Sequence, residues 1–216
     1  MRMTRLFVAG LIAVSFVPGA AYAQRVRDFE DSWFWGAKAG VATFSKDYDN
    51  TASAATFGLE WLITRSRGAL YVSLDQADVN ATGYVIDPNA EGAVRDVQIE
   101  KLRRVGFAAL AFPKKFGRVR PYGGLGLQID LLSHAYPLLS NTESDVSDDV
   151  YDRIDSRKSA AGLLMMGGAQ AQFNKAAFFA QASVVPANTR FLLRDALAFY
   201  ELGVRYNFGS SREGIK

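Results

Sequence analysis

The stretch GRVRPYGGLGLQID, residues 117–130, places four glycines around a proline and a tyrosine. Glycine-rich loops can cradle a phosphate, but they do so between a strand and a helix, with backbone amides and usually a lysine directed at the anion. After Gly126 the chain instead alternates apolar and polar residues with period two as far as Asp130, so no helix start is available. The stretch therefore predicts the beginning of a strand and argues against nucleotide binding.

His134 is the only histidine, and the chain has no cysteine. A metal cluster built on histidines or thiolates is therefore excluded, and one acid–base centre is the most that His134 could provide. Ser133 lies beside it, but adjacent residues of a strand point to opposite faces, so the two side chains are not expected to meet. We predict no catalytic residue, no metal site and no cofactor.

Acidic residues gather within residues 137–157, close to three basic residues. The stretch lacks the ligand spacing of an EF-hand, so we expect a solvated acidic loop. A long exposed loop is also where binding resides, and an extracellular partner or weak divalent-cation bridging through this loop stays open. The acidic residues are Glu143, Asp145, Asp148, Asp149, Asp152 and Asp155, and the basic ones are Arg153, Arg157 and Lys158.

The first 23 residues have the features of a cleavable signal peptide. Arg2 and Arg5 precede an apolar run over residues 6–16, and small residues stand where a signal peptidase would cut, before Gln24. The run is about half the roughly 20 residues of a spanning helix. Removing residues 1–23 lowers the formal charge from +3 to +1, because 25 basic residues become 23 against 22 acidic ones. We find no basic stripe and expect no nucleic-acid binding.

The mature chain reads as eight strands that alternate polar and apolar residues. Most of them reach the roughly 9 to 11 residues that cross a bilayer, against about 5 to 6 for an ordinary strand. In hydrocarbon an open sheet edge is costly, so a spanning sheet must close. The expected strands are residues 33–45, 53–65, 68–78, 96–112, 120–136, 158–173, 176–185 and 196–208.

The connections alternate between short turns and longer polar loops, as in outer-membrane barrels, where turns are periplasmic and loops external. Residues 66–67, 113–119 and 174–175 are the turns, and residues 46–52, 79–95, 137–157 and 186–195 the loops. We predict an all-β, eight-stranded antiparallel up-and-down transmembrane barrel over residues 24–208. A short periplasmic tail, residues 209–216, would follow. A periplasmic girdle would contain Trp33, Trp35, Phe112, Tyr122, Phe173, Tyr206 and Phe208.

Two motifs carry a resemblance to a known family. RPYGGLGLQ at residues 120–128 and YELGVRYNF at residues 200–208 resemble strands of the outer-membrane β-barrel domain family, which includes OmpA-like and opacity-type proteins. The resemblance implies an outer-membrane location and a last strand that the barrel-assembly machinery recognises. It assigns that assembly signal to Tyr200, Leu202, Val204, Tyr206 and Phe208.

An eight-stranded barrel is just wide enough for its own inward side chains to fill it. Unpaired buried charge is costly, so we expect the inward charged residues to form a salt-bridged polar core, with a gated polar path as the alternative. The predicted network comprises Lys38, Glu60, Arg104, Asp130, Glu201 and Arg205.

Lys101 and Arg103 face outward if Val105, Phe107 and Ala109 face lipid. They would then meet lipopolysaccharide phosphates near the outer leaflet, or else lie above the membrane in solvent. Both interpretations stay open, because the phase of this strand is the least certain.

We predict a monomeric, non-enzymatic outer-membrane protein with a surface or envelope role. One alternative is transport of small solutes or hydrophobic compounds. A second is a lipid A-modifying enzyme, because some barrels of this size have a serine and a histidine near the outer leaflet. A third is a soluble periplasmic lipocalin-like barrel. The apolar run Phe191 to Leu193 either folds over the barrel mouth or forms a contact site.

Overall fold

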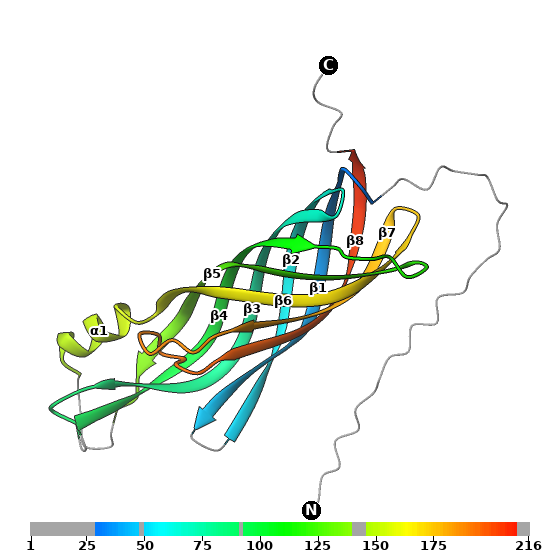
Figure 1. Ribbon diagram of the computed structural model, residues 1–216. Helices are drawn as coiled ribbons and strands as arrows, with labels where there is room; N and C mark the ends of the chain where they lie inside the picture. The colour runs from blue at the N-terminus through cyan, green and yellow to red at the C-terminus, as the bar shows by residue number, and fades with distance from the viewer. Residues whose placement is uncertain (1–28, 48–49, 91–92, 140–145, 211–216) are drawn as a thin grey trace, which may run out of the picture.

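The computed structural model describes residues 29–47, 50–90, 93–139 and 146–210, and the predicted signal peptide lies outside them. Eight antiparallel strands close into one barrel in the order β1-β2-β3-β4-β5-β6-β7-β8 (Figure 1), which confirms the predicted fold. The strands are β1 (Ser32–Asp47), β2 (Asn50–Arg65), β3 (Gly68–Ile86), β4 (Val94–Ala111), β5 (Val119–Pro137), β6 (Ser159–Phe173), β7 (Ala176–Val185) and β8 (Leu197–Ser210).

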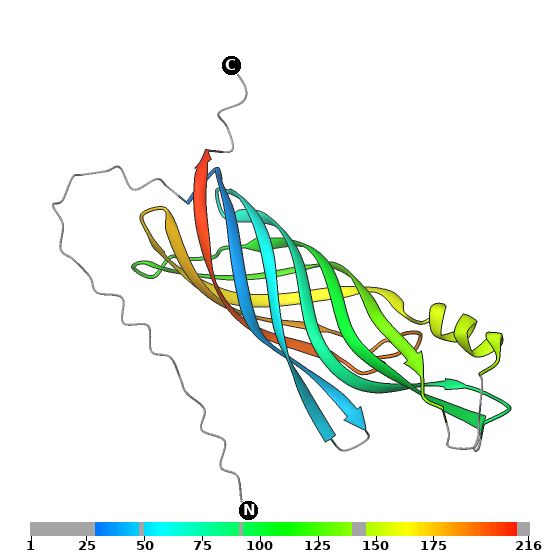
Figure 2. The ribbon, with the colours of Figure 1, turned by 180° about the vertical axis from the view of Figure 1, so that it is seen from behind.

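The two ends of the barrel differ. At one, which we call the turn end, β1 begins, β8 ends and the three short connections lie. At the other, the loop end, the hairpin of β3 and β4 projects to one side together with β5 and the helix α1 (Asp148–Asp155) (Figures 1 and 2). The pairing of β2 with β3 stops at Thr56 and Ala77, so the outer part of β3 continues without β2.

The predicted loop over residues 79–95 is wrong, because strands occupy most of it. β3 continues to Ile86 and β4 begins at Val94. The pattern resembles a loop because the outward-facing residues of β3 are polar after Leu74. Val79 and Val85 nevertheless still point inward, as in a strand. One extra residue bulges from β3, since Asp78 pairs with Lys101 but Ala81 with Ile99.

The alternation in β4 changes face at Glu100. Before Glu100 in the sequence, Val97 and Ile99 point inward. After it, Leu102 and Arg104 point inward. β5 changes face at His134, whose φ of 58° lies in the left-handed region that most residues avoid. The segments of β4 and β5 near the loop end therefore contain one irregular residue each, which keeps their apolar side chains inside the barrel.

A helix replaces part of the predicted loop over residues 137–157. α1 buries Val150 and Ile154, four residues apart on one face, and Val146 before it is also buried. Asp148 and Asp149 in the first turn suit the positive end of the helix dipole. None of the described residues forms a helix long and apolar enough to cross a membrane.

Gly126 occupies a place where a side chain does not fit. A Cβ there would overlap the backbone of Phe107 and Ala108 on β4, whereas a Cβ on Gly123 would lie 3.8 Å from the nearest atom, the carbonyl oxygen of Met166. We expect Gly126→Ala to destabilise the barrel by about 1–3 kcal/mol through overpacking. Urea titration of the refolded barrel measures this, and Gly123→Ala is the matched control. Equal effects of the two substitutions would contradict the steric account.

Candidate functional site

The outer face of the barrel is apolar where its interior is charged. Leu127 on β5, for example, is 66% exposed between Phe107 on β4 and Leu163 on β6, while Gln128 and Asp130 on the same strand are buried. A soluble lipocalin-like barrel has the opposite arrangement, with its apolar face inside. We call this outer zone the apolar belt. It contains Phe57, Leu59, Leu70, Leu74, Phe107, Leu125, Leu127, Ile129, Leu163, Phe178 and Leu202.

Five of the seven aromatic residues predicted for the girdle face outward at the turn end. Trp33, Trp35, Phe173, Tyr206 and Phe208 are exposed, and Trp61 stacks on Trp35, with ring centroids 5.8 Å apart. The prediction is wrong for Phe112 and Tyr122, which are buried. Both residues continue the alternation of inward-facing residues in β4 and β5. The prediction did not extend that alternation to the ends of these strands.

The turn end of the interior is filled by an aromatic cluster that includes a residue from before β1. Phe29 is buried, with its ring centroid 4.6 Å from that of Phe112 and 5.8 Å from that of Phe34. The hydroxyl of Thr64 donates to the Phe29 carbonyl oxygen, and Arg120 lies over the Phe29 ring at 4.5 Å. The segment that leads into β1 thus helps to close this end of the barrel.

Arg205 is the centre of the first buried charge cluster. Its Nε donates to Oε1 of Glu60, and its Nη1 donates to Oε1 of Gln170 at 2.6 Å. Its Nη2 donates to the Tyr122 hydroxyl and to Gln181, each at 3.3 Å, and the Phe179 ring lies 3.9 Å from the guanidinium carbon. Every guanidinium nitrogen of Arg205 therefore has an acceptor.

Lys38 and Arg104 share two carboxylates in the second cluster. Lys38 Nζ lies 2.9 Å from both Asp75 Oδ1 and Glu201 Oε2. Arg104 Nη2 lies 3.2 Å from Asp75 Oδ2 and 3.9 Å from Glu201 Oε1. Gln181 joins the two clusters, because its Nε2 donates to Glu201 Oε2 at 2.9 Å while its Oε1 accepts from Arg205.

The six residues of the predicted network are all buried, but one of them, Asp130, lies outside the two joined clusters. Five of them make the two clusters, whereas Asp130 forms no ion pair among the described residues and accepts a hydrogen bond from Gln128. Asp75 was missed by the sequence analysis. The period-two pattern could have identified Asp75, since it lies two residues from Ser73 and two from Ala77 on the inward face of β3.

At the loop end the interior is apolar, which the sequence analysis did not anticipate. Phe191, Leu192 and Leu193 fold over the mouth, so the first of the two interpretations of this loop is confirmed, and Gly83 on β3 approaches Leu192. The cluster there contains Phe44, Val79, Val85, Val97, Ile99, Leu102, Leu132, Val150, Ile154, Leu197 and Phe199.

A polar band crosses the outer face of β3, β4 and β5 above the apolar belt. Arg103 is exposed in it and Lys101 is half-buried. Gln98 Nε2 donates to Asn80 Oδ1 at 2.7 Å, and the Tyr136 hydroxyl donates to Glu100 Oε1 at 3.3 Å. The band comprises Gln76, Asp78, Asn80, Thr82, Gln98, Glu100, Lys101, Arg103, Ser133 and His134.

Apolar side chains are exposed a second time beyond the polar band, on a surface that we call the tip. Tyr84 and Ile86 come from β3, and Leu138 is joined to β4 by a hydrogen bond from its N–H to the carbonyl oxygen of Asp96. Asp96 in turn pairs with Tyr84, so the three strands present one continuous surface. The tip contains Tyr84, Ile86, Val94, Tyr136, Leu138 and Leu139.

A buried ion pair fixes the hairpin beneath the tip. Arg95 Nε lies 2.6 Å from Asp87 Oδ2, and Arg95 Nη1 donates to the Leu138 carbonyl oxygen at 3.0 Å. Arg194, from the loop between β7 and β8, lies over the Tyr84 ring at 3.9 Å. These contacts join residues of β3, β4 and the adjoining loops at the tip.

Ser133 and His134 do not form a catalytic pair in this arrangement. His134 is exposed and Ser133 is half-buried, and within the described ranges no hydrogen bond joins the two side chains. The described residues also contain no group of three or more His, Cys, Asp or Glu that could hold a metal ion.

The closed antiparallel barrel, the apolar belt and the charged interior define the class of protein: an eight-stranded transmembrane β-barrel of the outer-membrane type. The structure of Neisserial surface protein A (NspA) is similar, with a TM-score of 0.55 and 16% identity over 82% of this chain and 97% of that chain.

Two further solved structures align with lower scores. Ail, the attachment invasion locus protein of Yersinia pestis, solved with the heparin analogue sucrose octasulfate, gives a TM-score of 0.47 at 15% identity, over 82% of this chain and 99% of that chain. The outer membrane protein OprG from Pseudomonas aeruginosa gives 0.43 at 14% identity, over 84% and 98%. No protein-family description matches the chain. No curated protein matches it either.

Proposed function

We propose that the chain is a non-enzymatic outer-membrane protein that binds an extracellular protein partner at its tip, with the loop end outside the cell. The exposed apolar tip carries this proposal. Ile86 lies 12 residues beyond Leu74 of the apolar belt on the same strand, which is about 40 Å along the strand. The polar band lies between them, so the tip extends beyond the membrane into water, where a contiguous apolar surface is typical of a protein contact.

The charges around the tip indicate the chemistry of the partner. Asp96 lies between Tyr84 and Leu138, and Arg194 lies over the Tyr84 ring. The helix α1, which packs against β3 and β5, exposes Asp148, Asp149, Asp152 and Arg153, so acidic groups outnumber basic ones here. An apolar surface beside acidic groups is complementary to a protein that presents apolar side chains flanked by lysine or arginine. The part of the predicted 137–157 loop that the structure describes thus contributes charge through α1, and apolar contact through Leu138 and Leu139.

Two other predicted partners are supported by where their residues lie. Arg103 and Lys101 lie in the polar band, at the level where lipopolysaccharide phosphates meet a barrel that spans at the apolar belt. The predicted assembly signal lies on the outer face of β8, where the barrel-assembly machinery can reach it, since Tyr200, Leu202, Val204, Tyr206 and Phe208 are exposed. We propose both contacts for a monomeric barrel.

The interior gives transport less support than binding. Arg205 and its partners fill the barrel at one level, and the apolar cluster with Phe191 fills it at another. A path for solutes would require both layers to separate, and the first is held by buried ion pairs.

The tip can be tested with a designed peptide helix that has leucines on one face and lysines on the other. We expect the peptide to bind the barrel in lipid nanodiscs, as measured by fluorescence anisotropy, and Ile86→Asp with Leu138→Asp to reduce its affinity at least about tenfold by placing polar charge in the apolar contact. Phe116→Asp is the matched control, because Phe116 is 64% exposed at the turn end.

A version of the peptide with glutamates in place of lysines, and nanodiscs without the barrel, complete the design. The proposal fails if the double variant binds as tightly as the wild type. It fails equally if the acidic peptide binds as well as the basic one.

A further inference from the structure

The buried charges of the barrel do not balance. Among the residues that the structure describes, nine charged ones are buried, of which five are acidic and four basic. Four of the acidic residues, Glu60, Asp75, Asp87 and Glu201, have a basic partner. Asp130 is the fifth, and it is only 3% exposed.

One carboxylate oxygen of Asp130 accepts a hydrogen bond, and the other accepts none from the described residues. Gln128 Nε2 donates to Oδ2, whereas Oδ1 has no hydrogen-bond partner among the described residues. Arg104 is opposite Asp130 in the register of β4 and β5, but its guanidinium pairs with Asp75 and Glu201 instead. Arg104 therefore attracts Asp130 without forming an ion pair with it, and its Nη1 has no acceptor among the described residues. Lys38 and Arg104 already neutralise Asp75 and Glu201, so Asp130 leaves one excess buried negative charge. This excess favours the entry of a cation.

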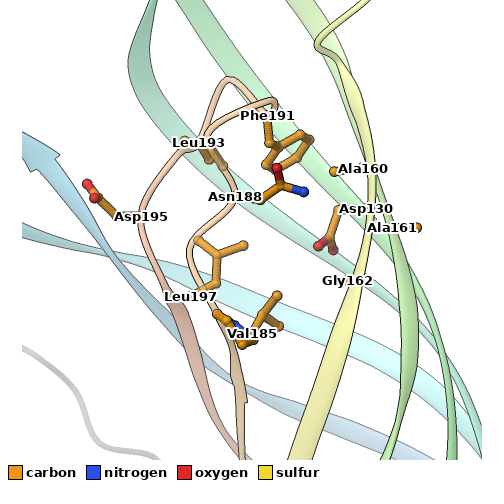
Figure 3. A pocket seen from close by; sticks show the side chains of 11 residues that line it. Asp130, Ala160, Ala161, Gly162, Val185, Asn188, Phe191, Leu193, Asp195 and Leu197 are labelled. Atoms are coloured by element: carbon orange, nitrogen blue, oxygen red, sulfur yellow. The ribbon is translucent and has the colours of Figure 1, made fainter.

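A small cavity lies beside this carboxylate, where the wall of the barrel is incomplete. The pairing of β6 with β7 begins at Met165 and Val184, so β6 from Ser159 to Leu164 has no partner on that side. The loop between β7 and β8 covers the gap, and the cavity of about 20 Å³ lies under it. Figure 3 shows the Asp130 side chain directed into this space, with Asn188 and Phe191 of the loop facing it.

The lining of the cavity selects among cations. Apart from Asp130, Asn188 and Asp195, its walls are apolar and include Val185, Phe191, Leu193 and Leu197. Calcium requires six to eight oxygen ligands, which this lining does not supply. An ammonium group requires one carboxylate, and it is the size of a single water molecule, which a cavity of this volume holds.

We propose that this cavity binds a small protonated primary amine. Its ammonium group fills the cavity and donates to Asp130 Oδ1. Its carbon chain extends past Val185 and Leu193 toward Asp195, where the lining reaches the surface. The ring of Phe191 adds a cation–π attraction, which strengthens when water is excluded. The site is distinct from the tip and does not depend on the proposed partner there.

The test uses ethylammonium chloride and the full barrel in nanodiscs with ¹³C-labelled leucine and valine methyl groups. We expect saturable shifts of the Val185 and Leu193 methyl signals in the wild type. Asp130→Asn should abolish them and raise the unfolding midpoint in the absence of amine, because it removes an unpaired buried charge. Asp149→Asn, which changes an exposed carboxylate on α1 outside the lining of the cavity, should keep the shifts.

Ethanol, a neutral molecule of the same size, and sodium chloride test the wild type without any substitution. Neither should reproduce the shifts. Equal shifts with ethanol, with sodium chloride or in Asp130→Asn would overturn the proposal, as would the absence of a saturable shift in the wild type. If Asp130→Asn fails to fold, the comparison of ethylammonium with ethanol decides alone.

Discussion

Arg205→Met is expected to lower the free energy of unfolding by about 3–5 kcal/mol, the cost of leaving one partner of a buried ion pair alone. Arg205 and Glu60 are both fully buried, and their side chains have 0% exposure. Once the guanidinium is gone, the buried carboxyl group of Glu60 has no counter-charge, and the acceptors Gln170, Tyr122 and Gln181 lose their donor. Urea titration of the barrel in lipid vesicles, followed by the fluorescence of its tryptophans, measures the loss.

Two further variants separate the charge effect from the loss of packing. Arg205→Met combined with Glu60→Gln should recover most of the stability, because the lone buried charge is removed. Arg65→Met is the control, since Arg65 pairs with Asp31 at 3.4 Å with 67% of its side chain exposed, and such pairs contribute about 0–1 kcal/mol. The account is wrong if Arg205→Met costs no more than Arg65→Met.

Leu127→Arg is expected to cost about 2–4 kcal/mol, the penalty of an arginine on the lipid face near the middle of the bilayer. Leu127 is suited to this test because its neighbours across both ladders, Phe107 and Leu163, are also exposed and apolar. The measurement is again urea unfolding in lipid vesicles.

Thr82→Arg provides the matched control for the membrane position. Thr82 lies in the polar band on β3, where the same side chain should cost about 0–1 kcal/mol because it reaches water or phosphate. If both substitutions cost the same, the apolar belt does not lie in the bilayer. Recovery of Leu127→Arg as a stable water-soluble protein would have the same meaning.

The strand positions were predictable from the sequence because a barrel wall imposes period two on every strand. The alternation placed Lys38, Glu60, Arg104, Asp130, Glu201 and Arg205 inside, and all six are buried. It did not reveal the pairs they form. Alternation fixes the face on which a side chain lies, whereas the partner also depends on side-chain torsions. Arg104 is directly opposite both Asp75 and Asp130, yet its guanidinium pairs with Asp75.

The errors at the loop end have three causes. The sequence pattern assumes that a strand keeps its phase, and β4 and β5 change face at Glu100 and His134. Where the outer face also becomes polar, as at Asp78 and Asn80, the pattern resembles a loop although the strand continues. α1 was missed because its eight residues include only two buried apolar side chains, which acidic neighbours obscure.

The position of the tip has a mechanical consequence. The strands of such a barrel are tilted by about 35–45°, so a partner that pulls on Ile86 away from the membrane applies a force whose larger component lies along β3 and β4, perpendicular to their hydrogen bonds. β3 would then have to slide against β2, from Thr56 to Arg65, and β4 against β5, from Val97 to Ala111. All the bonds of each ladder resist such sliding together, whereas peeling would break them one at a time. The tip is therefore attached in the direction in which a sheet is strongest under load.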